Sequence, residues 1–272
     1  MGGKEMTTSN GSAGLAVITG ASSGIGLELA RQFAEHGFDL VVAAEDDELA
    51  AAADDLQGAG VTVKPLRVDL ATDEGVEELA RLIRDAGRPV DALALNAGIG
   101  AGGPFVETDL GDELKLIDLN VRSVVHLAKH VVGDMSERGQ GRVLITSSIA
   151  STMPGSFQAV YNASKSFVQS FALALREELK DTGVTVTTLM PGPTDTEFFE
   201  RADMLDTRVG AGDKDDPADV ARDGFEALMA GDERVVSASF STKAQARTGH
   251  LLPDSAKAKM HRRMAEPGSA KD

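Results

Sequence analysis

Two side chains at helical spacing are the strongest candidates for proton-transfer chemistry in this chain. Tyr161, the only tyrosine, precedes Lys165 by four residues, which places both on one face of a helix. A phenol can protonate the alkoxide that hydride transfer to a carbonyl leaves behind, although its free pKa of about 10 limits this exchange. A nearby ammonium favours tyrosinate and lowers that pKa, and each unit is worth about 1.4 kcal/mol. We expect Ser148, at the end of an apolar run, to hold the carbonyl oxygen by a hydrogen bond.

A second chemical signature is the glycine-rich segment 19–26, Thr-Gly-Ala-Ser-Ser-Gly-Ile-Gly. It follows a short apolar run and opens a helical pattern. Glycine lacks the Cβ that would keep the backbone away from a pyrophosphate, and a following helix N-terminus offers free N–H groups and a positive dipole end. Glycine clusters also serve tight turns. The position between strand and helix nevertheless favours a dinucleotide-binding loop.

Seven short apolar runs with little polar alternation predict strands that are buried on both faces. These runs span residues 15–19, 40–43, 61–67, 92–95, 143–146, 184–190 and 235–238. Helical patterns separate most of them, and four of these patterns cover residues 26–35, 73–85, 118–135 and 159–181. This alternation predicts a single α/β domain in which helices cover both faces of a seven-stranded parallel sheet.

Three segments lie outside the regular alternation. Residues 1–13 are polar and rich in Gly and Ser, which predicts a disordered leader before a catalytic domain over 14–242. Residues 192–217 form an acidic insertion long enough to predict a functional loop. We expect an apolar substrate lid there, formed by Phe198, Phe199, Met204 and Leu205. Residues 243–272 form a basic tail, typical of a solvated amphipathic helix or a frayed end, with docking onto the acidic body or a partner subunit as the alternative.

Composition excludes several classes of function. The formal net charge is −16, from 27 Lys and Arg against 43 Asp and Glu, and so acidic a surface repels nucleic-acid backbones and anionic lipid. Cysteine is absent, which excludes disulfides and thiolate sites. No apolar run approaches the roughly 18 residues of a membrane span, and the first residues lack the apolar core of a secretory signal. We therefore expect a cytoplasmic protein with a small-molecule substrate and no nucleic-acid or membrane partner.

The order Thr-Gly-x-x-x-Gly-x-Gly resembles the short-chain dehydrogenase/reductase family, in its standard branch. Further motifs of that family match across residues 15–196. They are Asp69 within Val68-Asp69-Leu70 at the adenine position, Asn96-Ala97-Gly98 after the fourth predicted strand, Tyr161 with Lys165, and Pro191-Gly192 with Thr194 at the nicotinamide carboxamide. The resemblance implies a Rossmann-like three-layer sandwich. It also implies an NAD(P)-dependent oxidoreductase that interconverts a secondary alcohol and a ketone, or an aldehyde and its alcohol.

The resemblance also implies roles for individual residues. Tyr161 matches the general acid/base, Lys165 the group that lowers its pKa and anchors the ribose, and Asn120 the support of a proton-relay water. Ser148 matches the carbonyl-orienting hydroxyl, because the family's spacing to the tyrosine selects it over Ser147. By residue type alone, Asn120 also fits a cap or turn. The residues expected to contact the cofactor are Gly20, Ser22, Ser23, Gly24, Ile25, Gly26, Ala44, Glu45, Asp69, Leu70, Asn96, Ala97, Gly98, Tyr161, Lys165, Pro191, Gly192 and Thr194.

The end of the second predicted strand bears on which nicotinamide cofactor is used. Family members that prefer NAD usually carry Asp where this chain has Ala44, and members that prefer NADP usually carry Arg where it has Glu45. Neither rule is met. Glu45, Asp46 and Asp47 would repel a 2′-phosphate, no Lys or Arg occurs nearby to offset them, and Glu45 can accept a hydrogen bond from the ribose. We therefore expect NAD to be preferred, with NADP as the second candidate.

Two further patterns concern metals and subunits. His126 and His130 stand four residues apart, a spacing that can bind zinc, but no third ligand is evident and the family needs no metal, so we expect none. By resemblance, the helices that carry Asn120 and Tyr161 pair across a subunit interface, which predicts a homodimer or homotetramer. The wide apolar face of 159–181 can also be core.

Two rival functions remain open. One is an epimerase or dehydratase, although such chains usually have a differently spaced glycine motif and a substantial C-terminal substrate domain. The other is a non-catalytic dinucleotide sensor or scaffold, a class that tends to lose the tyrosine or lysine. The identity of the substrate, beyond an apolar carbonyl compound or alcohol, does not follow from the residues.

Overall fold

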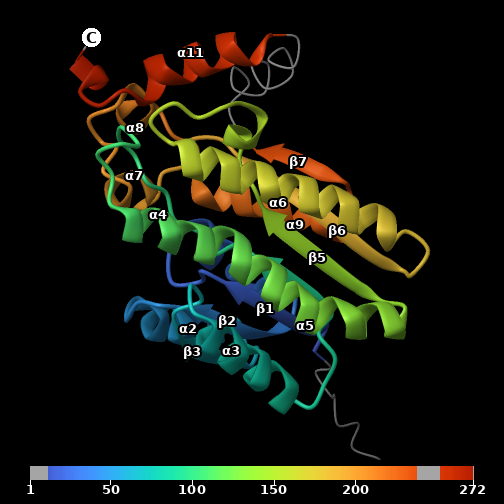
Figure 1. Ribbon diagram of the computed structural model, residues 1–272. Coiled ribbons are helices and arrows are strands. Elements are labelled where there is room, and N and C mark those ends of the chain that lie inside the picture. The colour runs from blue at the N-terminus through green and yellow to red at the C-terminus, as the bar shows by residue number, and fades with distance from the viewer. Residues whose placement is uncertain (1–11, 238–251, 272) are drawn as a thin grey trace, which may run out of the picture.

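The centre of the molecule is a sheet of seven parallel strands in the order β3-β2-β1-β4-β5-β6-β7 (Figure 1). The computed structural model describes residues 12–237 and 252–271. The strands are β1 (Gly14–Thr19), β2 (Phe38–Ala44), β3 (Val63–Arg67), β4 (Ala92–Leu95), β5 (Gly141–Thr146), β6 (Val184–Pro191) and β7 (Arg234–Ser237). The chain runs from β1 to one edge and then returns through β4 to the other edge. The strand order therefore reverses between β1 and β4, where open α/β sheets bind ligands.

Helices cover both faces of this sheet (Figure 1). On one face lie α1 (Gly24–Glu35), α2 (Glu48–Gln57) and α9 (Pro217–Ala230), whose apolar side chains share a core with β1 and β2. On the other face lie α3 (Asp73–Asp85), α5 (Ser123–Arg138) and α6 (Ala159–Glu178), which form a second core with β4, β5 and β6. Each central strand therefore buries both of its faces, which confirms the predicted α/β sandwich.

The predicted strands agree with the observed ones to within about two residues at each end. The largest differences are that β3 begins at Val63 instead of residue 61, and that β2 and β5 begin two residues earlier than expected. Residue 238 of the last predicted strand lies outside the described residues, as do residues 1–11 of the predicted leader. None of the helices within the described ranges is long and apolar enough to cross a membrane.

A small third core lies beyond the carboxyl ends of the strands. The segment after β6 contains α7 (Phe198–Arg201) and α8 (Arg208–Ala211), and the C-terminal helix α11 (Asp254–Ala265) packs beside α8 (Figure 1). Phe199, Ala202, Met204 and Ala265 form this core. The part of the basic tail that the structure describes is therefore docked on the body of the molecule instead of standing free in solvent.

Candidate active site

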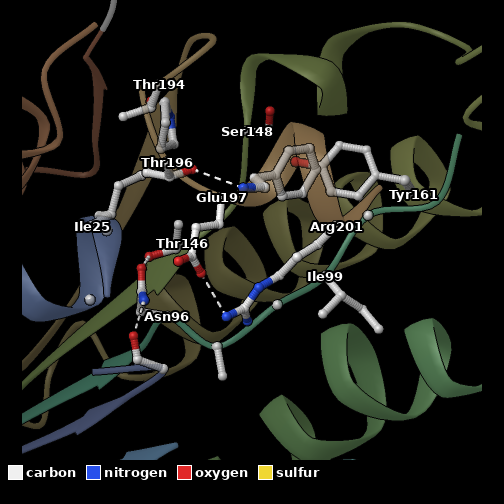
Figure 2. Close-up of a pocket in the computed structure, with 18 of the residues that line it drawn as sticks. Ile25, Asn96, Ile99, Thr146, Ser148, Tyr161, Thr194, Thr196, Glu197 and Arg201 are labelled. Carbon is white, nitrogen blue, oxygen red and sulfur yellow. Dashed lines mark hydrogen bonds and ion pairs between the residues drawn. The ribbon is translucent and has the colours of Figure 1, made fainter. Parts of the chain in front are cut away.

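A single cavity joins the glycine-rich loop to the candidate proton-transfer residues (Figure 2). It lies at the carboxyl ends of β1, β2, β4, β5 and β6, and segments from α6, α7 and α11 complete its wall. Parallel strands bring their carboxyl ends to one edge of a sheet, so residues separated by more than a hundred positions meet here. All of the residues predicted to contact the cofactor line this cavity.

The glycine loop has the shape needed for a close approach of phosphate. Gly24 has a φ of +53°, which side chains rarely tolerate, and a Cβ there would lie 2.8 Å from Cγ2 of Thr196. A Cβ on Gly26 would lie 1.8 Å from the carbonyl oxygen of Gly20, so only glycine fits the first turn of α1. The residues of that turn line the cavity, and the free N–H groups of a helix N-terminus suit a pyrophosphate.

Asn96 fixes the ends of three neighbouring strands. Its Nδ2 donates to the carbonyl oxygen of Thr19 at 3.2 Å, and its Oδ1 accepts from Oγ1 of Thr146 at 3.0 Å (Figure 2). Its backbone N–H donates to Oγ1 of Thr19 at 3.0 Å. The side chain thus ties β1, β4 and β5 together beneath the cavity. Ala97 and Gly98, which follow it, line the cavity directly.

Asn120 lies in a local widening of the helix that the sequence did not predict. The helix expected over 118–135 begins as a π-helical turn (Asp118–Arg122), which directly follows α4 (Leu110–Ile117), and continues as α5. The Asn120 side chain is fully enclosed: Oδ1 accepts from the N–H of Ile99 at 2.9 Å, and Nδ2 donates to the carbonyl oxygen of Ile99 at 2.8 Å. Single π-turns in helices are common at functional sites. This one fastens the helix to the loop after β4.

Tyr161, Lys165 and Ser148 converge from α6 and the end of β5. Tyr161 and Lys165 are both buried one helical turn apart, and the Lys165 Nζ lies 5.9 Å from the centre of the Tyr161 ring. Nζ donates to the carbonyl oxygen of Thr146 at 3.0 Å. The Ser147 hydroxyl donates instead to the carbonyl oxygen of Lys165 at 2.9 Å, so it holds α6 against β5. Of the two adjacent serines, Ser148 is the one whose side chain is hydrogen-bonded to Tyr161.

Burial sets the proton affinities of this pair. It raises the pKa of Tyr161 to about 12, while the hydrogen bond with Ser148 acts in the opposite direction. Burial also lowers the pKa of Lys165 to about 8, because an ammonium loses its hydration there. Burial therefore dominates the pKa of Tyr161 in the cofactor-free protein, and the lowering of that pKa by Lys165 stays a prediction. The cost of burying both groups exceeds any gain from the ammonium, whose hydrogen bond goes to Thr146.

The end of the cavity beside β2 and β3 carries more positive charge than the sequence suggested. Ala44, Glu45 and Asp46 line it, together with Asp69 and Leu70. Lys115 from α4 lies 3.0 Å from Glu45, and Arg201 from α7 lies 3.5 Å from Asp46. Arg67 at the end of β3 pairs with Asp47. The expectation that no basic residue lies near these three carboxylates is therefore wrong. The basic residues are distant in the sequence, but the fold brings them to the carboxylates from three other elements.

The insertion at 192–217 is folded over one side of the cavity. Its two ends are joined where the N–H of Asp195 donates to the carbonyl oxygen of Asp215 at 2.9 Å. Phe198 and Phe199 line the cavity, and the Phe198 ring centre lies 5.1 Å from that of Tyr161. The other two residues of the expected lid lie elsewhere. Met204 is buried in the third core, and Leu205 is 55% exposed on the outer surface.

Several residues that line the cavity carried no signal in the sequence. From the insertion, Thr196, Glu197 and Arg201 face it, with Arg201 paired to Glu197 at 2.6 Å (Figure 2). From α11, His261 and Met264 reach its far wall. No local motif marks them, because their positions depend on how the segment after β6 folds back.

The histidine pair on α5 has a third potential ligand that the sequence did not reveal. Oε1 of Glu77, from α3, lies 2.9 Å from Nε2 of His126 and 2.8 Å from Nε2 of His130. These hydrogen bonds lower the pKa of Glu77. The three residues join α3 to α5 and do not line the cavity.

Comparison with known proteins agrees with this geometry. Residues 14–204 match the family model described as short chain dehydrogenase. Sulfoacetaldehyde reductase 2 of Chromohalobacter salexigens is 35% identical over 187 residues, which cover 68% of this chain and 74% of that protein. A short-chain dehydrogenase/reductase from Burkholderia phymatum in complex with NAD superposes with a TM-score of 0.80 at 28% identity, over 87% of this chain and 92% of that one.

A second solved structure differs in its cofactor. The short-chain dehydrogenase from Sphingobium yanoikuyae in complex with NADPH superposes with a TM-score of 0.78 at 28% identity, again over 87% of this chain and 92% of that one. The strand order, the glycine loop and the family-model match over most of the chain lead to one conclusion. This chain belongs to the short-chain dehydrogenase/reductase family and is an NAD(P)-dependent oxidoreductase.

Proposed function

We propose that this enzyme interconverts a secondary alcohol and a ketone, or an aldehyde and its alcohol, with Tyr161 as the general acid/base. The observation that carries the proposal is that Tyr161 and Ser148 line the same cavity as the glycine-rich loop. A substrate bound beside the cofactor would therefore meet a phenol and a hydroxyl at its reacting oxygen. The nicotinamide, when bound, supplies or accepts the hydride.

The chain's own residues supply the proton and the positioning. Ser148 donates a hydrogen bond to the carbonyl oxygen and stabilises the charge that develops there. A phenol with a pKa of about 12 stays protonated at neutral pH, so Tyr161 holds its proton until an alkoxide forms next to it. For oxidation of an alcohol, the same phenol must first lose a proton. The ammonium of Lys165 supports that step when its charge is directed to the phenolate.

Asn120 and Lys165 position the catalytic groups and the cofactor. Asn120 holds the backbone of Ile99 and so fixes the floor of the cavity, where it supports a proton-relay water. Lys165 lies beside Gly98, close enough that a Cβ there would approach Nζ to 3.2 Å, and anchors the ribose of the cofactor. Pro191, Gly192 and Thr194, at and after the end of β6, line the cavity and would bind the carboxamide of the nicotinamide.

For the cofactor, we propose a preference for NAD over NADP. Glu45 lies at the end of β2 on the cavity wall, where its carboxylate can accept a hydrogen bond from a ribose hydroxyl. Lys115 and Arg67 are occupied by Glu45 and Asp47, so they are not free to bind a 2′-phosphate. Relatives with NAD and with NADPH are both known, so the charges at this strand end decide the preference.

We also propose that two or more copies associate through the apolar surface over α4 and α6. Six large apolar side chains there are at least 40% exposed, which is more than a monomer usually leaves in contact with water. They are Phe105, Val106, Leu110, Leu114, Ile117 and Phe167. Light scattering at micromolar concentration should give the mass of a dimer or tetramer, and a monomer would contradict the proposal.

The decisive experiment for the proposed function compares the wild-type enzyme with Tyr161→Phe. We expect wild-type protein to oxidise NADH in the presence of at least one member of a panel of aryl and alkyl ketones and aldehydes. Tyr161→Phe should retain NADH binding but lose turnover by at least about a hundred-fold, the usual contribution of general acid–base catalysis. NADH binding by the wild type without turnover of any panel member would favour the non-catalytic sensor.

A further inference from the structure

His261 is the polar side chain that α11 contributes to the cavity. Its ring is 95% buried and lines the same cavity as Ser148 and Tyr161, beside the apolar Met264. The match to the family model ends at residue 204, so α11 lies outside the matched part of the chain.

The hydrogen bonds of the ring define which nitrogen carries the proton. Nδ1 lies 2.9 Å from the carbonyl oxygen of Ser156. A carbonyl oxygen only accepts, so Nδ1 must carry a hydrogen and donate it. Burial lowers the pKa of His261, and the ring is therefore neutral near neutral pH. In a neutral imidazole with its hydrogen on Nδ1, Nε2 is a bare acceptor.

The ring is held in this orientation by the surrounding backbone. The Ser156 hydroxyl donates to the carbonyl oxygen of Ala258 at 2.9 Å, which ties the loop before α6 to α11 a second time. The Arg262 guanidinium lies 5.3 Å from the centre of the Phe157 ring and adds a third contact between them. The imidazole therefore cannot turn its other edge to the cavity without breaking the link to Ser156.

Nothing in the described part of the chain satisfies Nε2. No residue there forms a hydrogen bond with this nitrogen. Apolar side chains also line this cavity, among them those of Met153, Phe198, Phe199, Val209 and Met264. Nε2 is therefore available to accept a hydrogen bond from water or from a ligand that enters the cavity.

We propose that Nε2 of His261 accepts a hydrogen bond from a hydroxyl group of the substrate, at a distance from the carbon that undergoes hydride transfer. This inference rests on the proposed function. It defines the substrate class as an apolar carbonyl compound or alcohol that carries a second hydroxyl on the side away from Ser148 and Tyr161. A site built around one hydrogen bond rejects analogues that lack the hydroxyl more strongly than an apolar pocket can.

The test uses two substitutions that divide the functions of the imidazole. His261→Asn keeps an N–H group near the Nδ1 position, so it preserves the link to Ser156 but removes the acceptor. His261→Gln places an amide near the Nε2 position and so restores a polar partner for the substrate. His36→Gln, on an exposed histidine outside the cavity, serves as the matched control. The probe substrates are benzylacetone and its meta- and para-hydroxy derivatives, reduced with NADH.

We expect the wild type to prefer one hydroxy derivative over benzylacetone in kcat/KM by roughly ten-fold, the value of one good hydrogen bond. His261→Asn should lose that preference by slowing only the hydroxylated ketone, and His261→Gln should recover part of it. Equal losses on all three ketones would indicate a purely structural role and overturn the proposal, as would an unchanged preference in His261→Asn.

An independent measurement needs no turnover. NMR of the ring nitrogens, with the His261 signal assigned by its disappearance in His261→Asn, should show a hydrogen on Nδ1 and a bare Nε2. A hydrogen on Nε2 would make it a donor and overturn the proposal. Failure to reduce any of the three ketones, with NADH bound, would count against the proposed function, and the ring tautomer would then decide the inference alone.

Discussion

At the scale of single residues, the site combines a phenol that resists losing its proton with a lysine that is costly to keep charged. Burial is the common cause, since it raises the pKa of Tyr161 to about 12 and lowers that of Lys165 to about 8. The enzyme therefore retains a charged group where the fold alone would favour an apolar one. Such a compromise between stability and activity is typical of catalytic sites.

This compromise predicts that Lys165→Met makes the protein more stable while it abolishes turnover. The pKa of Lys165 is about 8 when folded and 10.5 in its ordinary state, so unfolding takes up a proton between these values. Burying this lysine costs no stability above about pH 10.5, where it is neutral in both states. The cost grows as the pH falls, and it reaches its full size below about pH 8. The 2.5-unit difference corresponds to about 3 kcal/mol at neutral pH. Allowing for the lost hydrogen bond to Thr146, we expect a gain of about 1–3 kcal/mol.

Urea unfolding of the cofactor-free protein at neutral pH and at pH 10 measures this effect. The advantage of Lys165→Met should shrink at the higher pH, because the wild-type lysine is then largely neutral when folded. Lys180→Met, on an exposed lysine, is the control and should leave stability unchanged at both pH values. A Lys165→Met protein that is less stable than the wild type at neutral pH would show that burial does not penalise the ammonium.

At the scale of elements, the end of β2 is a cluster of carboxylates balanced by cations from β3, α4 and α7. We predict that Glu45→Gln shifts the ratio of NADPH to NADH affinity towards NADPH by roughly ten-fold, because it removes one repulsive charge and frees Lys115 to bind a phosphate. The shift should fade at high salt, since Glu45 and Lys115 are both partly exposed.

Fluorescence titration with the two reduced cofactors at matched ionic strength measures this ratio. Glu48→Gln removes an equal charge on α2 outside the cavity and should change neither affinity. If both substitutions shift the ratio equally, long-range charge decides the preference and the pairing with Lys115 is irrelevant. Tighter binding of NADPH than NADH by the wild type would contradict the proposed preference itself.

The elements that sequence predicted well are those whose signal is local. The apolar runs of β1 and β4 are continuous because both sides of each strand are covered, and the glycines at 20, 24 and 26 have no room for a side chain. The π-helical turn at Asn120 was missed, because it depends on a backbone hydrogen-bond pattern that no residue type marks. The cations around Glu45 were missed because they come from other elements, one of them 70 residues away.

At the scale of the whole molecule, the C-terminal helix and the insertion after β6 form one wall of the cavity. The N–H of Gly268 donates to Oδ2 of Asp206 at 2.7 Å, and the N–H of Ala270 donates to the carbonyl oxygen of Asp206 at 2.9 Å. The basic composition of this tail could not predict the docking, since the contacts are mostly backbone hydrogen bonds and one small apolar core. From its charge alone, a solvated helix and a docked helix were both consistent with the sequence of this tail.

These contacts predict that Asp206→Ala destabilises the C-terminal helix and the insertion after β6 together, without affecting the sheet. Loss of the bond to Gly268 should accelerate hydrogen exchange by about ten-fold in α11 and in α7 and α8, because these segments share a core of only a few side chains. The KM should rise with little change in kcat, since the substitution moves the wall and leaves Tyr161 and Ser148 in place. Asp213→Ala, an exposed change in the same insertion, should leave both measurements unaltered. Faster exchange in α11 alone would mean that the tail and the insertion open independently, and the wall would then be two elements instead of one.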